Sequence, residues 1–409
     1  MLLIGGDEYN SKIMLKKRLN SDSRTGIYAR DAEAMLKKII TLEWYALLLC
    51  IISIPLFESP KSIFLVISAI LFLIRHYIEK DYKSVLLAKD PRIGLLALAF
   101  VSSLSAVFAL HPFLAFQGSM DFLKMYALFI IVASDFSDGK YIKTIILAIV
   151  ASTTIGTGWG LANFMIGREA TFELLSVGHV NHSSIYLALS LTVIIAYLEH
   201  LKTTSEKIFF YISSIILIAA FVIASSRASF LAFGAAMLMV FICMEKKKQF
   251  VSFSVMFFLI TAVLIYFVDM TLLTKDYSFR DASLKTRLNL WSKGWEMFLS
   301  HPILGVGAKH FKFYNPFEYG SHAHNLLINT LAQFGIAGFS ALMVFFYFIL
   351  RSLKAAYKRN MLWSSACGAF IIVLMNGMFN TTLHSEHGLL FVLISAMISG
   401  NRLKVPADK

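Results

Sequence analysis

Residues 326–350 read LLINTLAQFGIAGFSALMVFFYFIL and contain no charged side chain. A helix of this length can cross the hydrocarbon core of a bilayer, which needs about 20 apolar residues. Similar runs recur along the 409 residues, of which 57% are hydrophobic and only 15% are charged, with a mean hydropathy of +0.69. This composition excludes a soluble globular domain. Because backbone polar groups must bond internally within lipid, the runs predict transmembrane helices rather than strands.

The predicted fold class is therefore all-α: a polytopic membrane protein with about 12 transmembrane helices and one large polar loop that contains short helices. The fourth span is the weakest, because Asp121 and Lys124 lie in its first turn, and only a tight turn separates the seventh span from the eighth. The predicted spans are 40–57, 61–77, 93–110, 121–134, 141–162, 182–198, 207–223, 228–243, 250–270, 326–350, 361–379 and 387–400.

The distribution of basic residues predicts the orientation. If the N-terminus lies in the cytoplasm, most of the 38 Lys and Arg residues fall in cytoplasmic segments, as the positive-inside rule requires. The net charge of +13 is explained in the same way, so no nucleic-acid partner is expected. The predicted parts are a basic cytoplasmic tail (1–39), spans one to nine (40–270), a loop outside the cytoplasm (271–325), spans ten to twelve (326–400) and a cytoplasmic tail (401–409).

The N-terminal tail lacks the apolar segment of a cleavable signal peptide, and we expect residues 13–38 to form a basic helix on anionic headgroups. Cys50, Cys243 and Cys367 lie in or beside apolar runs and are interpreted as small buried hydrophobic residues. The predicted orientation also gathers polar side chains of the binding type on one face of the membrane. They are Arg168, Asn181, His182, Arg227, His384, His387 and the residues of loop 271–325.

Arg227 stands between two apolar runs, in the segment ASSRAS (224–229). A cation at membrane depth is costly and is usually functional. A helix start offers free N–H groups and partial positive charge, so Arg227 and its neighbouring serine hydroxyls would form an anion site there. The alternative interpretation is an arginine that extends to the lipid headgroups.

Within the polar loop, Arg287 lies shortly before Trp291. Leu288, Trp291, Trp295 and Leu299 recur every three to four residues, which predicts an amphipathic helix near the membrane surface. Because tryptophan favours the membrane interface, simple anchoring is one interpretation of this stripe. For Arg287, an anion-binding role and a solvated surface charge are both open.

His322 and His324 flank Ala323 directly before the tenth span, and three interpretations are open: a polar helix cap, a metal chelator and a general base. No third ligand follows at a diagnostic spacing, so no metal site and no cofactor are predicted. A helix N-terminus keeps a nearby imidazole neutral and able to accept a proton, which makes His324 the candidate base and His322 its rival. Gly335 and Gly338 in the following span would let a neighbouring helix approach closely.

Taken together, the order and spacing of these residues resemble the bacterial O-antigen ligase family and the related O-antigen polymerases. The resemblance covers roughly residues 160–345 by motif and the whole chain by topology. The residues that carry it are Ser226-Arg227-Ala228, Arg287, Trp291, Pro302, Gly305-Val306-Gly307, His324-Asn325, Gly335 and Gly338.

The resemblance implies a membrane-embedded glycosyltransferase of the GT-C type in the bacterial inner membrane, with its active site on the periplasmic face. The implied donor is an O-antigen linked to undecaprenyl diphosphate, the acceptor is a sugar of the lipid A-core oligosaccharide, and the transfer inverts the anomeric centre without a metal. His324 would be the general base, and Arg227 and Arg287 would bind the diphosphate. The candidate substrate-binding residues are Arg168, Asn181, His182, Trp291, His322 and Asn325.

Two other functions are compatible with parts of the pattern. An O-antigen polymerase uses the same donor with a second lipid-linked glycan as acceptor, and one sequence does not identify the acceptor. A transporter or flippase of lipid-linked sugar would carry charged residues along a path through the spans and would show internal repeats, which this sequence lacks.

Overall fold

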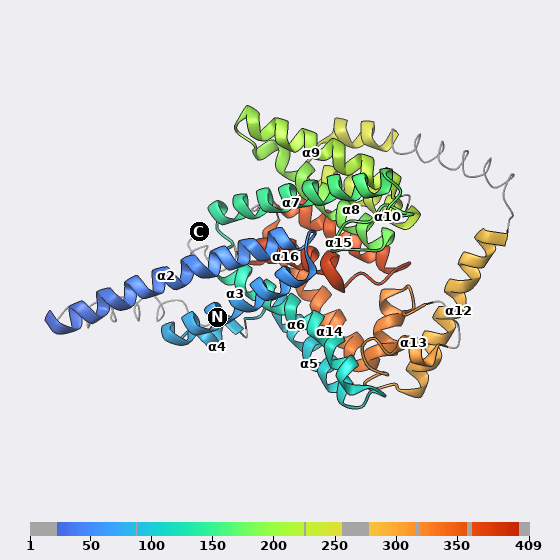
Figure 1. Ribbon diagram of the computed structural model, residues 1–409, viewed down its shortest axis with the longest axis horizontal. Coiled ribbons are helices and arrows are strands. Elements are labelled where there is room, and N and C mark those ends of the chain that lie inside the picture. The colour runs from blue at the N-terminus through green and yellow to red at the C-terminus, as the bar shows by residue number, and fades with distance from the viewer. Residues whose placement is uncertain are drawn as a thin grey trace.

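The computed structural model describes residues 23–86, 88–224, 226–255, 278–315, 320–357 and 362–400, and every regular element in these ranges is a helix (Figure 1). The predicted all-α class is confirmed for this part of the chain. In chain order the helices are α2 (Ser23–Ser53), α3 (Glu58–Glu79), α4 (Tyr82–Leu86), α5 (Pro91–Val107), α6 (Pro112–Asp135), α7 (Gly139–Met165), α8 (Val180–Tyr197), η1 (Leu198–His200), α9 (Thr204–Ile223), α10 (Arg227–Cys243), α12 (Ser278–Ser300), α13 (Phe311–Tyr314), α14 (Leu326–Ala356), α15 (Trp363–Gly377) and α16 (Ser385–Ser399).

Six helices in the described ranges are long and apolar enough to cross a membrane: α3, α6, α7, α8 with η1, α9 and α14. The helices α5, α10, α15 and α16 are apolar but shorter. This pattern supports a multi-pass membrane protein, but it does not confirm the predicted count of about twelve spans. Most of the ninth predicted span, 250–270, lies outside the described residues.

The helices α8 and α16 form the centre of the bundle. Nearly all of their residues are buried, and α16 contacts α6, α8 and α15. By contrast, α9 lies at the periphery and exposes apolar side chains such as Ile212 and Ile215, as expected of a surface that faces lipid. In Figure 1, α2 extends from one end of the molecule, and α12 and α13 lie at the opposite end.

Residues 302–307 are joined to a break in α14. Gly335 has φ +61° and ψ −160°, so the regular helical hydrogen bonds are interrupted on both sides of it. The backbone N–H groups of Val306 and Gly307 donate to the carbonyls of Ala332 and Gln333, at 3.0 and 2.9 Å. On the other side of the break, the N–H of Ile336 donates to the carbonyl of Pro302 at 2.8 Å. The loop backbone therefore satisfies groups that the break leaves without partners.

This break corrects the expectation for Gly335 and Gly338. A Cβ at Gly335 would lie 2.4 Å from the backbone of Ile303, so the glycine makes room for the loop rather than for a neighbouring helix. A Cβ at Gly338 would meet Phe334 of the same helix. The predicted close helix approach is wrong at both positions, because the polar loop folds back onto α14 instead.

Two further expectations concern the first part of the chain and the cysteines. The helix α2 runs without a break from Ser23 to Ser53, so no structural boundary separates the tail from the first predicted span at residue 39, and residues 1–22 lie outside the described ranges. Cys50 is buried as predicted. Cys243 and Cys367 are only half-buried free cysteines.

Candidate active site

Three side chains that are far apart in the sequence are linked through their charges, because Arg227 acts on Arg287 and Arg287 acts on His324. Arg227 is the first residue of α10, Arg287 lies on α12, and His324 stands in the turn before α14. Burial lowers the pKa of Arg287 from its usual value, and the charge of Arg227 lowers it further. The charge of Arg287 in turn acts on His324. Two guanidinium groups and an imidazole therefore share one electrostatic environment.

The arginine charges have no carboxylate partner among the described side chains. Arg287 instead lies against an aromatic face, with its Cζ atom 6.0 Å from the ring centroid of Phe379. Arg227 is exposed and Arg287 is half-buried. Partly desolvated guanidinium groups without a local counter-ion suit the binding of an external anion.

His324 has a left-handed backbone, with φ +49°, which is uncommon for a residue with a side chain. The next residue holds it in place. The side-chain oxygen of Asn325 accepts hydrogen bonds from the N–H groups of Leu327 and Ile328, both at 3.0 Å, and its Nδ2 group donates to the carbonyl of Met378 at 3.1 Å. Asn325, rather than either histidine, is thus the cap of α14.

Burial lowers the pKa of His324 below its usual value of 6.5, and the charge of Arg287 adds to this effect. The side chain of Asn380 acts in the opposite direction. The sequence predicts a neutral imidazole because of the helix dipole. The lowered pKa of His324 agrees with a neutral imidazole, but its main cause is burial rather than the helix dipole.

His324 belongs to a larger group of histidines. Its ring centroid lies 4.3 Å from that of His322, and His322 lies 6.1 Å from His384. Burial lowers the pKa of both His322 and His384 to about 3, so these imidazoles are neutral at physiological pH. His182 and His387 lie beside His384, with ring centroids 4.8 and 4.9 Å from it. The sequence pattern predicts His384 and His387 on this face of the membrane but gives them no role.

The start of α10 is joined to the start of α8. The Ser226 hydroxyl donates to Oδ1 of Asn181 at 3.1 Å, and the Ser229 hydroxyl donates to Oδ1 of Asn376 at 3.0 Å. The hydroxyls next to Arg227 are therefore used to connect α8, α10 and α15. This differs from the expectation that they would line an anion site, and it leaves the arginine as the charged group of that turn.

Two of the predicted substrate-binding residues have few contacts in the described structure. Arg168 is exposed just after α7, and no described side chain bonds to its guanidinium. Trp291 is half-buried on α12, and its Nε1 group is buried without a partner among the described residues. The predicted apolar stripe of α12 is largely exposed, including Trp295, while Leu290 and Met297 form the buried face. The stripe is thus free to contact lipid.

A cavity of about 570 Å³ opens beside the histidines. Three of them line it, together with lysines from the loop and apolar side chains of α6 and α14. One of its walls carries a buried ion pair between Lys61 and Glu386. The polar residues that line the cavity include His182, His322, His384, Lys124, Lys309, Lys312, Asn329 and Gln333, and the apolar ones include Leu98, Phe122, Met125, Phe334, Leu342 and Leu389. A cavity with both kinds of wall can accept a molecule that has a polar head and an apolar chain.

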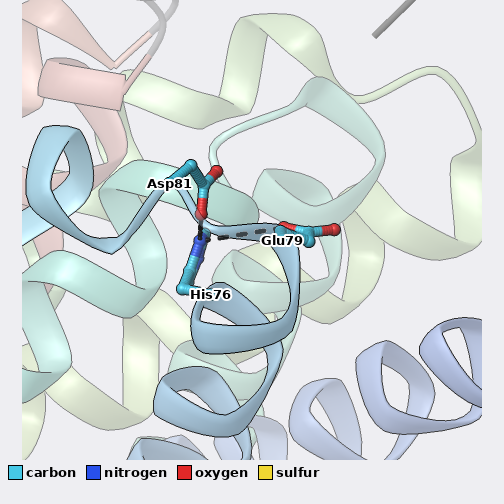
Figure 2. Close-up of side chains that lie close together, drawn as sticks. All are labelled: His76, Glu79 and Asp81. Carbon is cyan, nitrogen blue, oxygen red and sulfur yellow. Dashed lines mark hydrogen bonds and ion pairs between the residues drawn. The ribbon is translucent and has the colours of Figure 1, made fainter. Parts of the chain in front are cut away.

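A second cluster of ionisable groups lies at the C-terminal end of α3, among His76, Glu79 and Asp81 (Figure 2). These side chains present ligand atoms within 4.8 Å of one another. His76 is already bonded on both sides, by Asp81 at 2.7 Å through Nδ1 and by Asp135 at 3.1 Å through Nε2. The adjacent Arg75 is paired with Glu43 and Asp135. The cluster is a network of ion pairs that satisfies its own charges.

The comparison with known families agrees with the resemblance found in the sequence. Residues 212–343 match a protein family described as O-Antigen ligase. The matched region runs from α9 into α14 and contains Arg227, Arg287 and His324. No curated protein matches the chain. The match and the apolar helices support an inner-membrane, multi-pass enzyme of the O-antigen ligase or polymerase type, with lipid-linked glycan and lipid A-core as partners in general.

Proposed function

We propose that this protein is an O-antigen ligase, which transfers a glycan from undecaprenyl diphosphate to a sugar hydroxyl of the lipid A-core on the periplasmic face of the inner membrane. The observation that carries the proposal is the meeting of Arg227, Arg287 and His324, which come from three separate elements of the domain matched to this family. The proposed orientation follows the positive-inside distribution of Lys and Arg.

The two arginines would bind the donor diphosphate. The leaving group carries its own charge and needs no general acid, but negative charge builds up on it as the glycosidic bond breaks. A planar guanidinium can hold phosphate oxygens through paired hydrogen bonds. Each such donor in a water-poor site contributes roughly 2.7–4 kcal/mol to the transition state. The absence of a carboxylate partner among the described side chains leaves both arginines available for this purpose.

His324 would act as general base. The acceptor hydroxyl oxygen attacks the anomeric carbon, its proton passes to the ring of His324, and the bond from the anomeric carbon to the diphosphate oxygen breaks. The electron pair of that bond leaves with the diphosphate, and attack from the opposite side inverts the anomeric centre. The lowered pKa keeps the ring unprotonated at neutral pH, so that it can accept the proton. No step requires a metal.

The remaining predicted residues would bind the substrates. The cavity lined by His182 and His322 is the proposed chamber for the sugars, and its apolar wall suits the lipid part of a substrate. Asn181 and Asn325 use their side-chain oxygens for hydrogen bonds to Ser226 and to the start of α14, so their contribution would be to position Arg227 and His324. Arg168 and Trp291 would contact the glycan or the headgroup region of the lipid.

A polymerase remains the second candidate, since it shares the donor chemistry, and the match to the family does not distinguish the acceptor. A transporter is disfavoured, because Arg227, His324 and His384 stand at the beginnings of helices rather than along a path through the spans.

The test is transfer by purified protein in detergent. The protein receives a glycan on undecaprenyl diphosphate with either lipid A-core or a second lipid-linked glycan as acceptor. Glycosylation of lipid A-core alone supports a ligase, elongation of the lipid-linked glycan supports a polymerase, and no transfer to either acceptor contradicts both. In cells, a gene deletion that leaves bare core agrees with a ligase, whereas core with one repeat indicates a polymerase.

A further inference from the structure

Three imidazoles form a nearly equilateral triangle where the start of α8 meets the start of α16. The ring centroids of His182 and His384 are 4.8 Å apart, those of His384 and His387 are 4.9 Å apart, and those of His182 and His387 are 5.1 Å apart. Three imidazoles on one tetrahedral zinc ion, with metal–nitrogen bonds of about 2.0–2.1 Å, have ring centroids about 5 Å apart. The spacing of the ring centroids therefore matches a three-histidine metal site, although the ring nitrogens as they stand do not all lie within 4.8 Å of one another.

The hydrogen bonds of His387 favour a ligand rather than a simple core residue. Its side chain has no exposed surface, its Nε2 group donates to the carbonyl of Thr381 at 3.4 Å, and its Nδ1 atom has no partner among the described residues. A hydrogen on Nε2 leaves the lone pair on Nδ1. Metal-binding histidines commonly donate their second nitrogen to a backbone carbonyl in this way. A buried ring nitrogen without a partner is otherwise costly.

His384 also has a ring nitrogen without a hydrogen-bond partner among the described residues, namely its buried Nδ1 atom. His182 completes the triangle from another helix, so an ion bound here would hold α8 against α16.

The triangle borders the cavity described above, because His182 and His384 are among its lining residues. The nearest carboxylate of this segment, on Glu386, is paired with Lys61.

We propose that His182, His384 and His387 form a binding site for a divalent transition-metal ion that prefers imidazole, with Zn²⁺ as the expected ion. Binding requires the rings to turn about their Cβ–Cγ bonds, so that one nitrogen of each faces the centre of the triangle, and a water molecule from the cavity completes the tetrahedron. The site is distinct from the His322–His324 pair, shares His182 with the proposed sugar chamber, and can be tested without glycosyl transfer.

The experiment measures metal binding directly. Full-length protein in detergent is treated with EDTA, desalted and titrated with Co²⁺, whose visible absorption reports tetrahedral nitrogen ligands, and then with Zn²⁺, which displaces it. The expected result is one equivalent of tetrahedral Co²⁺ per chain that Zn²⁺ replaces. No stoichiometric binding to the native protein, or a purely octahedral Co²⁺ spectrum, would overturn the proposal.

Variants locate the ion. His387→Ala and His384→Ala are each expected to lose the bound equivalent of Co²⁺. His387→Cys is expected to keep it, with an added thiolate-to-cobalt absorption band. The matched control is His301→Ala, which removes an exposed histidine of the polar loop and should bind as the native protein does. His324→Ala should also retain the ion.

Loss of the ion in His324→Ala together with its retention in His384→Ala would place the metal on the His322–His324 pair and refute the triangle. Because the residue at position 384 is partly exposed, His384→Ala tests the site even if His387→Ala does not fold.

Discussion

Two regions of this protein place an arginine near a histidine. In one region the basic groups have acidic partners, and in the other they have none among the described side chains. At the end of α3, Arg75 and His76 are surrounded by carboxylates, and each basic group has at least one acidic partner within hydrogen-bonding distance. Near the start of α14, Arg287 and His324 have no acidic partner among the described side chains, and each has its pKa lowered by burial and by a neighbouring cation.

This difference in charge pairing distinguishes a structural ion-pair network from a candidate binding site. A buried charge that is paired within the protein stabilises the fold only through that pairing, and removing one partner is expensive. Half-buried Arg287 and exposed Arg227 repel each other, and a bound anion would relieve this repulsion. The first region therefore holds α2, α3 and α6 together through ion pairs. The second region has the unpaired positive charge expected of a diphosphate-binding site.

The largest effect should come from the proposed base. His324→Ala is expected to lower the transfer rate by about 100- to 10,000-fold, the usual contribution of base catalysis, while His322→Ala keeps measurable activity. The measurement is the initial rate of transfer by purified protein. A dead His322→Ala beside an active His324→Ala would assign the proton transfer to the other ring.

In the paired region the expected loss is in stability. Arg75→Met leaves Glu43 and Asp135 without their shared cation and should cost about 3–5 kcal/mol of folding free energy, with unchanged activity per folded molecule. Thermal unfolding in detergent and specific activity are measured on the same sample. The control is Lys37→Ala, which breaks an exposed pair with Glu33 worth about 0–1 kcal/mol. An equal loss of stability in both variants would show that the buried network has no special role.

The arginines of the unpaired region are expected to matter for rate rather than for stability. Arg227→Ala and Arg287→Ala should each reduce transfer by roughly 100- to 1,000-fold, because each removes a donor to the leaving diphosphate. Neither should lower the unfolding temperature, since no described carboxylate loses a partner. Lys285→Ala, an exposed substitution on the same helix as Arg287, serves as the control. Normal transfer by both arginine variants would refute the proposal that these arginines bind the donor diphosphate.

The pH dependence should reflect the unpaired environment. The pKa of His324 is lowered from 6.5, and only the neutral ring accepts a proton. As the pH falls, the rate should therefore be retained through pH 6.5 and should decline only below it, by about tenfold per pH unit. Rates at saturating substrate across a pH series test this. An acid limb centred at or above pH 6.5 would mean that the base is not desolvated as the structure shows.

The smallest expected effect is that of a chelator. Transfer should be unchanged by EDTA, because the arginines already supply the positive charge that a metal would bring to the diphosphate. The rate is compared before and after EDTA treatment and desalting. Loss of activity that added metal restores would contradict a metal-independent reaction, either through a catalytic ion or through an ion at the histidine triangle that holds α8 against α16.

Local sequence is sufficient for the helical class and for the choice of candidate side chains. The apolar runs become helices, and even the weak fourth span, with Asp121 and Lys124 in its first turn, lies within the single helix α6. Arg227, Arg287 and His324 stand out because of their residue types next to predicted helix ends. These features depend on hydrophobic periodicity and on neighbours in the chain, which the sequence shows directly.

Local patterns fail wherever a distant segment supplies the partner. Asn325 caps α14 and also reaches Met378, the oxygen of Asn181 is bound by Ser226, and Gly335 makes room for the backbone of Ile303. None of these partners lies near its residue in the chain. No periodicity or short motif reports such contacts.

What the amino-acid sequence alone determined is a membrane chain of helices that carries arginines and histidines outside its apolar runs. Hydrophobic length and residue chemistry fix this much, since both act within a few residues. Only the tertiary structure decided that α8, α10, α12, the turn before α14 and the turn before α16 converge, so that the cations lie together without described carboxylates and three imidazoles form a triangle. Packing between helices decides this, because burial and electrostatic repulsion depend on neighbours in space rather than on neighbours in the chain.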